Sequence, residues 1–519
     1  MMMDVLALLA LSAGRMLIAY LISLVLAYVL GYFMAREPVI ERMLMPIIDV
    51  LQSIPILVFF PPVISIFINN IPGYGIEAAE IFLIIACMVW NMIFSVYESF
   101  TSLRQSLKDI TVMFKVNEID RFFKIYLPYI SIGMVPNSMA SWANGWFFLI
   151  ATEIISVGKE TYALRGIGSY IMQSAIQGDV LGIMTGIGLV SLLIVLMDIF
   201  IWRPLMNISS KYIKGKKELM IYDRILDFTP DAHIRINRAV GMASRFLDEH
   251  LADPMAGIMR SRALDRGFRL LKAATKYLII ASVFALVAAL AYTIYSMGSL
   301  ITLEDIAIVA GAFAHSLSRI MVAYLLCIAW IIPAVYLISR SGGYEANIIR
   351  WMEIVGSIPV SAIFPAAIII LTSVLGNFET VAIIFMMTGM QWYLFFNIYG
   401  AYKSMPEYVH DLKSMYSIGG PDFTRRIVMP FMMPFIILGS CAAIGGGWNT
   451  AIVAEYVSFG SSTFEAHGIG SMIHRALIEG DMKSMFLCTM VVAIAIPAIN
   501  ICFWRPMMKA ASKKRGSLV

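Results

Sequence analysis

The sequence is poor in charge and lacks the common motifs of covalent chemistry. Only 14% of its 519 residues are charged, whereas 60% are hydrophobic. It contains no Gly-x-x-x-x-Gly-Lys-[Ser/Thr] phosphate loop, no His-Glu-x-x-His pair and no nucleophile elbow. We therefore expect no catalytic residues, and we expect neither a bound cofactor nor a metal on this chain.

Cysteine is scarce, and so are signals of processing. The five cysteines all lie in apolar segments without Cys-x-x-Cys spacing, which predicts small buried side chains and no disulfides. The N-terminus has no basic region and no small-residue cleavage site, and its apolar run continues to Phe33. This pattern predicts a first membrane-spanning helix, not a removable signal peptide.

Hydrophobic runs are abundant. A mean hydropathy of +0.81 is typical of a membrane protein, because so much apolar surface does not fit inside a water-soluble core. Stretches of about 20 apolar residues recur along the whole chain, and we count about eleven spans. The net charge of +5 is expected to lie in cytoplasmic loops near membrane lipid, so we predict no nucleic-acid partner.

The chain contains an internal repeat. Trp90, Trp146 and Trp202 recur 302 residues later as Trp392, Trp448 and Trp504. At this offset Asp109, Asp120, Pro128 and Glu153 correspond to Asp411, Asp422, Pro430 and Glu455, and at 304 residues Arg15, Ser53 and Pro55 correspond to Arg319, Ser357 and Pro359. Such self-similarity predicts two copies of one all-α bundle, related by a pseudo-two-fold axis with a path between them.

The repeat predicts the domain organisation. Residues 1–206 form the first half with about five spans, residues 207–272 a polar cytoplasmic linker, and residues 273–519 the second half with about six. The sixth is an extra apolar segment at 273–295. Two parallel copies then require the N-terminus outside and the C-terminus inside, which also places most basic residues inside.

Each half contains a charged loop that ends at a proline. The loops contain Asp109, Lys115, Asp120, Arg121 and Pro128, and Asp411, Gly419, Asp422, Arg425 and Pro430. They resemble the ATPase-docking motif of ABC importer permeases, Glu-Ala-Ala-x3-Gly-x9-Ile-x-Leu-Pro. The first loop has Asp109 in place of Glu, then Ile125, Leu127 and Pro128; the motif glycine is replaced by Lys115 there and by Ser417 in the second loop.

The wider pattern resembles the nitrate, sulfonate, taurine and bicarbonate class of these permeases. An early arginine, a Ser-Ile-Pro step and a glutamate before a Gly-Ile-Gly turn occur in both halves. The resemblance implies two tandem type I ABC importer permease bundles in the cell membrane. It also implies two ATPase subunits that carry ATP and Mg²⁺, a separate outer solute-binding protein, a small inorganic or organic anion as solute, and alternating access.

Charged side chains within spans need partners, since each costs about 2.5 to 3.5 kcal/mol on insertion scales. We predict two ion pairs that hold neighbouring helices near the outer gate, Arg15 with Glu153 and Arg319 with Glu455. The alternative is that the arginines face the path and attract an anion.

Other polar or interrupted positions are candidates for the translocation path. Ser53, Pro55, Ser357 and Pro359 should interrupt their helices, and Asn144, Trp146, Trp448 and Asn449 lie on the helices that end at the glutamates. Simple kinks and close helix contacts are the alternative explanations.

Two other transport functions remain open from the sequence. A secondary transporter or channel needs no ATPase, although the chain has few of the paired carboxylates that ion coupling requires. An ABC permease for a metal, thiamine or an amino acid also fits the pattern. The sequence does not name the solute.

Overall fold

The computed structural model describes residues 2–103, 113, 121, 125–157, 160–210, 262–298, 301–405, 420–423, 427–459 and 462–516. The central part of the predicted linker therefore lies outside the described residues. So do Asp109, Lys115, Asp120, Asp411, Gly419 and Arg425 of the predicted docking loops.

The first series of elements starts with three helical segments around a break. α1 (Met2–Arg36) is followed by α2 (Pro38–Ser53), a short 3-10 turn η1 (Ile56–Phe59) and α3 (Phe60–Asn70). The long helices α4 (Gly75–Ser102) and α7 (Leu127–Thr152) come next, then the hairpin β1 (Ile154–Val157) and β2 (Glu160–Ala163). α8 (Ile167–Ile176), α9 (Val180–Met197), the π-helical turn η3 (Asp198–Trp202) and α10 (Arg203–Ser210) complete the series.

The second series has the same order. It comprises α14 (Leu303–Ser339), η7 (Gly342–Tyr344), α15 (Glu345–Ser357), α16 (Val360–Leu375), α17 (Phe378–Lys403) and α20 (Met429–Ala454), with the short α19 (Gly420–Phe423) before α20. The hairpin β3 (Tyr456–Phe459) and β4 (Ser462–Glu465), α21 (Ile469–Glu479), α22 (Met482–Ile499), η9 (Asn500–Trp504) and α23 (Arg505–Gly516) follow. Both π-helical turns end at the repeated tryptophans Trp202 and Trp504, so the repeat extends to the irregular elements.

Local chemistry explains why the boundaries recur. Gly178 and Gly480 adopt left-handed φ angles of +69° and +70°, which glycine tolerates without steric cost. The following aspartates, Asp179 and Asp481, cap α9 and α22 by accepting hydrogen bonds from backbone N–H groups of the first turn. Each Gly-Asp pair therefore ends one helix and starts the next at the same place in both series.

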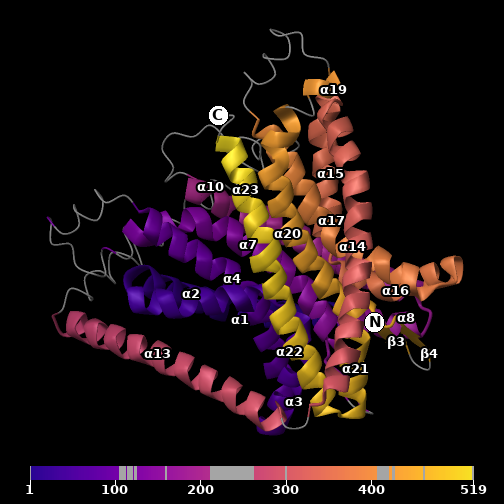
Figure 1. Cartoon of the computed structure of the whole chain (residues 1–519), viewed down its shortest axis with the longest axis horizontal. Coiled ribbons are helices and arrows are strands. Elements are labelled where there is room, and N and C mark those ends of the chain that lie inside the picture. Colours follow the sequence, from indigo (N-terminus) through magenta and orange to yellow (C-terminus); the bar gives the residue numbers. More distant parts are fainter. Residues whose placement is uncertain are drawn as a thin grey trace.

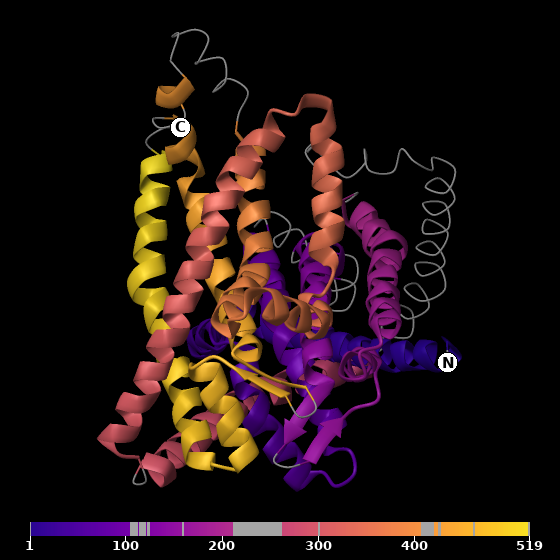
Figure 2. The same ribbon diagram turned by 90° about the vertical axis from the view of Figure 1, so that its right-hand side faces the viewer.

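The structure confirms a predominantly α-helical chain, with two short antiparallel hairpins that the sequence analysis did not predict. Each hairpin has four paired positions, such as Ile154 with Ala163 and Tyr456 with Glu465. Figure 2 shows both hairpins toward the same end of the molecule, and α21 contacts β1 across the two series. Pairing two short strands satisfies the backbone groups of a chain that leaves a helix at Glu153 or Glu455.

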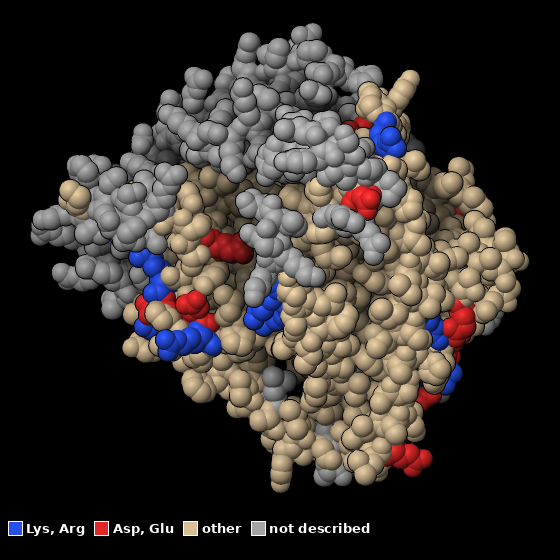
Figure 3. All heavy atoms as spheres, turned by 45° about the horizontal axis from the view of Figure 1, so that its top comes forward, with Lys and Arg blue, Asp and Glu red and all other residues tan. Residues whose placement is uncertain are grey.

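Among the described residues, eight helices are long and apolar enough to cross a membrane, or nine if the bent pair of α2 with η1 and α3 forms one span. The expected count of about eleven includes α7 and the α15–α16 pair as well. α7 carries Asn137, Ser141 and Asn144, which lower its hydropathy below that of its counterpart α20. Figure 3 shows how few charged side chains the described residues present on one face of the molecule.

Within each series the long helices form a layered bundle. α4 lies between α1 and α7, and α17 lies between α14 and α20 (Figure 1). Between the series, the elements that follow each break cross over: η1 and α3 contact α22, while α16 contacts α7, α8 and α9. The two series are therefore held together by their interrupted helices.

The extra helix α13 (Arg262–Gly298) lies apart from the bundle of the second series, to which its chain position assigns it. It packs against α2, with Lys276 Nζ 2.6 Å from Glu37 Oε2 (Figure 1). Large apolar side chains along it, including Phe284 and Tyr292, are exposed, as expected for a helix that faces lipid.

Candidate functional site

A cluster of charged groups, which we call the first cluster, joins α1, α4 and the end of α7. Arg15 binds Glu77 in a bidentate manner, with Nε 2.7 Å and Nη2 2.6 Å from the two carboxylate oxygens. Its Nη1 lies 3.0 Å from Oε1 of Glu153. The Arg15 side chain is 7% exposed and Glu153 is fully buried. The predicted ion pair between Arg15 and Glu153 is therefore present, with Glu77 as a second acid that the sequence analysis missed.

Glu153 also attaches the start of α8 to α1. Its carboxylate accepts hydrogen bonds from the Ser12 hydroxyl and from the Gly168 backbone N–H, the latter at 2.6 Å. Ser12 lies three residues before Arg15 and so on the same face of α1, and its hydroxyl accepts a bond from Ile167 N–H at 2.9 Å. An anion at a helix N-terminus is stabilised by the free N–H groups there, so the carboxylate fixes α8 in place.

The Gly-Ile-Gly turn leaves room for this carboxylate. A Cβ on Gly166 would lie 2.0 Å from Oε1 of Glu153, although the extended backbone of Gly166 is open to any residue. In the second series a Cβ on Gly468 would lie 2.3 Å from Oε2 of Glu455. The turn glycines therefore allow the close approach of a buried acid.

The second cluster repeats this arrangement on α14, α17 and the end of α20. Arg319 binds both oxygens of Glu379, and its Nη1 lies 2.9 Å from Oε1 of Glu455. Ser316 donates to Glu455 at 2.9 Å and accepts from Ile469 N–H at 2.8 Å. The second predicted ion pair is thus also present. Glu379 lies 302 residues after Glu77 and Ser316 lies 304 after Ser12, so the repeat itself could have identified these partners.

The two clusters differ at one position. Glu80 lies one helical turn after Glu77 on α4, is fully buried, and has Oε2 3.2 Å from Arg15 Nε. The corresponding residue in the second series is Ala382. There, Arg319 donates its additional hydrogen bond to the backbone carbonyl of His467 at 2.8 Å. Sequence analysis missed Glu80 because it has no repeated partner.

The predicted breaks after Ser53 and Ser357 are present. α2 and the η1–α3 segment bend by 93° around Ile54 and Pro55. Pro359 caps α16, and the chain between α15 and α16 is extended. Both breaks lie where one series meets the other, since η1 contacts α20 and α16 contacts α7.

Hydrogen bonds across the two series cluster at these breaks. The Ile56 N–H donates to Asn449 Oδ1 at 3.0 Å, and Asn500 Nδ2 donates to Ser53 Oγ at 3.3 Å. On the other side Ser361 donates to the Phe147 carbonyl at 2.9 Å. Phe147 corresponds to Asn449, whereas Ser361 corresponds to Leu57, the residue after Ile56, so the two contacts lie at neighbouring positions of the repeat.

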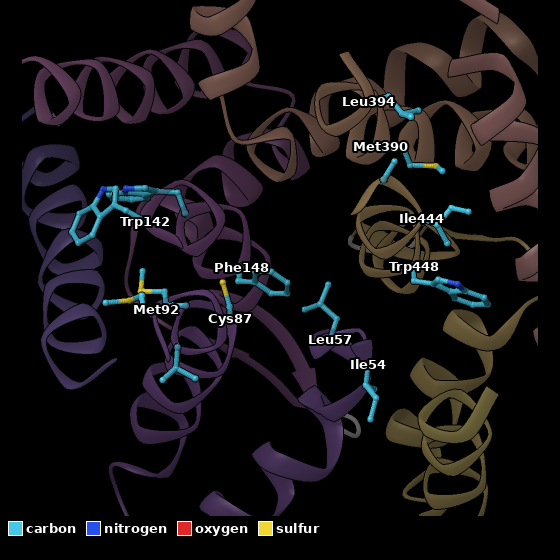
Figure 4. Close-up of a cluster of buried hydrophobic side chains, with 14 of the residues drawn as sticks. Ile54, Leu57, Cys87, Met92, Trp142, Phe148, Met390, Leu394, Ile444 and Trp448 are labelled. Atoms are coloured by element: carbon cyan, nitrogen blue, oxygen red, sulfur yellow. The ribbon is translucent and has the colours of Figure 1, made fainter. Parts of the chain in front are cut away.

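Apolar side chains fill the space around the first break. Figure 4 shows Ile54 and Leu57 between α7, which carries Phe148, and α20, which carries Ile444 and Trp448. Ile54 and Leu57 are both buried. The contact between the series is thus mostly apolar, with a few directed hydrogen bonds at the breaks.

The path candidates on α7 and α20 occupy different environments. Asn144 accepts a hydrogen bond from Tyr393 Oη of α17 at 3.2 Å, and so lies, like Asn449, between the two series. Trp146 is fully buried, and Trp448 stacks on Phe313 of its own series with ring centroids 4.8 Å apart. The structure therefore brings the two asparagines to the contact between the series, whereas both indoles are buried.

Only part of each predicted docking loop is described. Arg121 is half-buried and Asp422 is exposed. Pro128 and Pro430 occupy the first turn of α7 and α20, where a missing N–H costs no helical hydrogen bond. The described residues contain no group of three or more His, Cys, Asp or Glu side chains suited to a metal ion.

α21 carries a histidine that the first series lacks. His474 stacks on Tyr456 with ring centroids 5.2 Å apart, and Nδ1 lies 3.0 Å from the Gly470 carbonyl oxygen. Burial lowers the pKa of His474, and its contact with the carbonyl only partly opposes this shift. Met172 occupies the corresponding position on α8.

These observations define a multi-pass α-helical membrane protein built from two repeated series of elements, in which interrupted helices meet and buried acid–arginine clusters hold each bundle. Residues 27–202 match the family described as binding-protein-dependent transport system inner membrane component. This match lies within the first series, and together with the relatives described below it makes the chain similar to ABC transporter permeases, among them a nitrate and a bicarbonate permease.

The relatives align with about a third of the chain. Nitrate import permease protein NrtB of Leptolyngbya laminosa is 25% identical over 192 residues, which cover 36% of this chain and 63% of that relative. A probable ABC transporter permease protein of Brucella melitensis is 24% identical over 187 residues, covering 36% and 71%. Bicarbonate transport system permease protein CmpB of Synechocystis is 25% identical over 164 residues, covering 31% and 53%.

Proposed function

We propose that the chain is a transmembrane permease subunit that supplies both permease halves of an ATP-driven importer for a small inorganic or organic anion. The observation that carries this proposal is the repetition of the whole series of elements, because the family match falls within the first series alone. The second series then supplies the second permease bundle. Residues 1–206 and 273–519 are the two halves, and residues 207–272 connect them.

The contacts between the two series support the proposal of alternating access. Each interrupted helix lies against the other series, so a rocking motion of one half moves the breaks apart. Asn144 and Asn449 lie at this contact and are our candidates for the path, together with the Ser53–Pro55 and Ser357–Pro359 breaks. The arginine clusters are our candidates for fixed points, because both guanidinium groups already bind two acids and offer little charge to an anion.

The proposed energy source is a pair of ATPase subunits at the two charged loops, on the inner side of the cell membrane. A separate solute-binding protein would deliver the anion from outside, and the N-terminus would lie outside with the C-terminus inside. The proline-terminated loops before α7 and α20 and the similarity to known ABC permeases support this arrangement.

Reconstitution tests the proposal directly. Proteoliposomes that contain the chain, the ATPase pair and the binding protein should transport nitrate, bicarbonate or a sulfonate. Transport should occur only when ATP is present on the side of the membrane where the ATPase subunits lie. Anion flux driven by the chain alone would instead identify a secondary transporter or a channel. Uptake of a metal, thiamine or an amino acid in place of every anion would overturn the solute class but not the permease function.

A second experiment tests the docking loops. Charge reversal at both Asp109 and Asp411 should release the ATPase subunits from the purified complex. The matched control is Arg475→Gln on α21, which removes an exposed ion pair with Glu465 of β4, beyond the C-terminal end of α20, and should leave the complex intact. Equal ATPase content in all three samples would contradict the docking role.

A further inference from the structure

The first series contains a buried acid that lies within ion-pair distance of Arg15 but accepts no hydrogen bond from it, and that the proposed transport function does not use. Glu80 on α4 is fully buried, within the part of the chain that the structure describes in full. Its Oε1 accepts a hydrogen bond from the Thr152 hydroxyl at 3.2 Å. Its Oε2 has no hydrogen-bond partner among the described residues.

Arg15 does not satisfy Glu80, although the two side chains are close. The single hydrogen on Arg15 Nε points to Glu77 at 2.7 Å, whereas Glu80 Oε2 lies 3.2 Å from the same nitrogen without a hydrogen bond. The Nη1 and Nη2 groups donate to Glu153 and Glu77. Two carboxylates therefore already bind the one guanidinium group.

The remaining surroundings of Glu80 are negative or neutral. Glu77 lies on the same helix, and Glu153 lies at the end of α7, which packs against α4. α1 contributes Arg15, while η1 and α3, the other elements packed against α4, contain no titratable side chain. Three ionised carboxylates would thus share one positive charge, and a buried charge without a partner is costly.

We propose that Glu80 is a proton-binding site: its carboxyl is protonated while α1, α4 and α7 are in contact, and it releases the proton when water reaches the cluster. The proposal concerns this chain alone and does not depend on which solute it transports. The second cluster has Ala382 at this position and binds no such proton.

Proton binding at Glu80 makes the stability of the folded chain depend on pH in one direction. The proton at Glu80 is held while the cluster is buried and is lost when the chain unfolds or the cluster becomes hydrated. Stability from this site is therefore greatest where the carboxyl is protonated and falls as rising pH removes the proton.

Infrared spectroscopy on the full chain in lipid nanodiscs tests the proposal. At about pH 7, near the middle of the range in which most proteins are stable, the wild-type protein should show a carboxylic acid C=O band that is missing in Glu80→Gln. The matched control Glu379→Gln should keep the band, and Ala382→Glu should add a second one. Identical carboxylic acid bands in the wild type and Glu80→Gln would overturn the proposal.

Thermal unfolding provides a second readout that a purely structural role would not change. The Tm of Glu80→Gln, relative to the wild type, should rise as the pH increases, because the variant has no proton to lose. Ala382→Glu should make the dependence on pH steeper. A constant difference in Tm between the wild type and Glu80→Gln across the pH range would contradict proton binding at Glu80.

Discussion

The first and second clusters use the same parts but balance their charges differently. Each has a serine and an arginine one turn apart, an acid at the start of the next long helix, and a buried acid bound to a helix N-terminus. The first cluster adds Glu80, whereas the second adds a backbone carbonyl from His467. The repeated backbone therefore determines which elements each cluster connects. Single side chains determine how many charges the cluster contains.

The contacts between the two series differ in a similar way. Arg505 of α23 forms an ion pair with Asp49 on α2 of the other series. Its counterpart Arg203 instead binds Asp198 at 2.8 Å within its own series. Asn500 occupies the position of Asp198 and donates to Ser53 across the contact. The second series thus has an amide, Asn500, where the first has an acid, and its arginine, Arg505, binds an acid of the other series instead.

The largest expected effect compares the two buried acids. Glu455→Gln leaves Arg319 with only the half-exposed Glu379, and breaking a buried pair costs about 3 to 5 kcal/mol. Glu153→Gln should cost clearly less, since Glu80 can ionise and take its place beside Arg15. Chemical unfolding of the purified variants measures both. Equal losses of unfolding free energy in the two variants would show that Glu80 does not compensate for Glu153. The double variant Glu80→Gln with Glu153→Gln should lose as much stability as Glu455→Gln.

A smaller and symmetric effect is expected at the two turns. Gly166→Ala and Gly468→Ala each place a methyl group within 2.3 Å or less of a buried carboxylate oxygen, and overpacking typically costs about 1 to 3 kcal/mol. The control is Gly445→Ala on α20, whose added Cβ meets nothing within 4 Å and which should be neutral or slightly stabilising. Differential scanning calorimetry in detergent ranks the stabilities of the three variants. An unchanged Tm in Gly166→Ala would contradict the close approach of Glu153 to this turn.

The histidine on α21 should make only the second series sensitive to mild acid. Because burial lowers the pKa of His474, the folded chain resists its protonation, and stability should fall as the pH decreases below about 6.5, the ordinary histidine value. His474→Met introduces the residue found on α8 and should remove this loss. Measurements of Tm from neutral to mildly acidic pH test this prediction, with Met172→Leu as the control. An unchanged pH profile in His474→Met would exclude His474 as the cause.

The smallest effect is expected at the contact between the series. Arg505 is 46% exposed, and exposed ion pairs contribute about 0.2 to 1 kcal/mol. A double-mutant cycle with Asp49→Asn and Arg505→Gln should yield a coupling energy in this range, which should decrease at high salt. The cycle with Asp49→Asn and Arg203→Gln should yield none. Coupling in the second cycle would show that the measured energy does not report the direct contact between Asp49 and Arg505.

Part of the candidate site could be predicted from the sequence. A lone arginine and a lone glutamate in apolar segments must find partners, and their common offset made Arg15–Glu153 and Arg319–Glu455 the natural pairs. Glu77 and Glu379 follow from the same offset but were missed, because they stand at helix ends where acids are common. Glu80 could not be predicted in this way, because the residue at its position in the second series is Ala382 and the repeat gives it no counterpart.

The membrane-spanning class, the repeat and the positions of the breaks can be read from the amino-acid sequence, because hydropathy, offset and proline are local properties of the chain. The folded chain is needed to see that the broken helices cross to the other series, that α13 packs on α2, and that three acids surround Arg15 but two surround Arg319. These features depend on contacts between residues far apart in the chain, and such contacts arise from packing that no local pattern specifies.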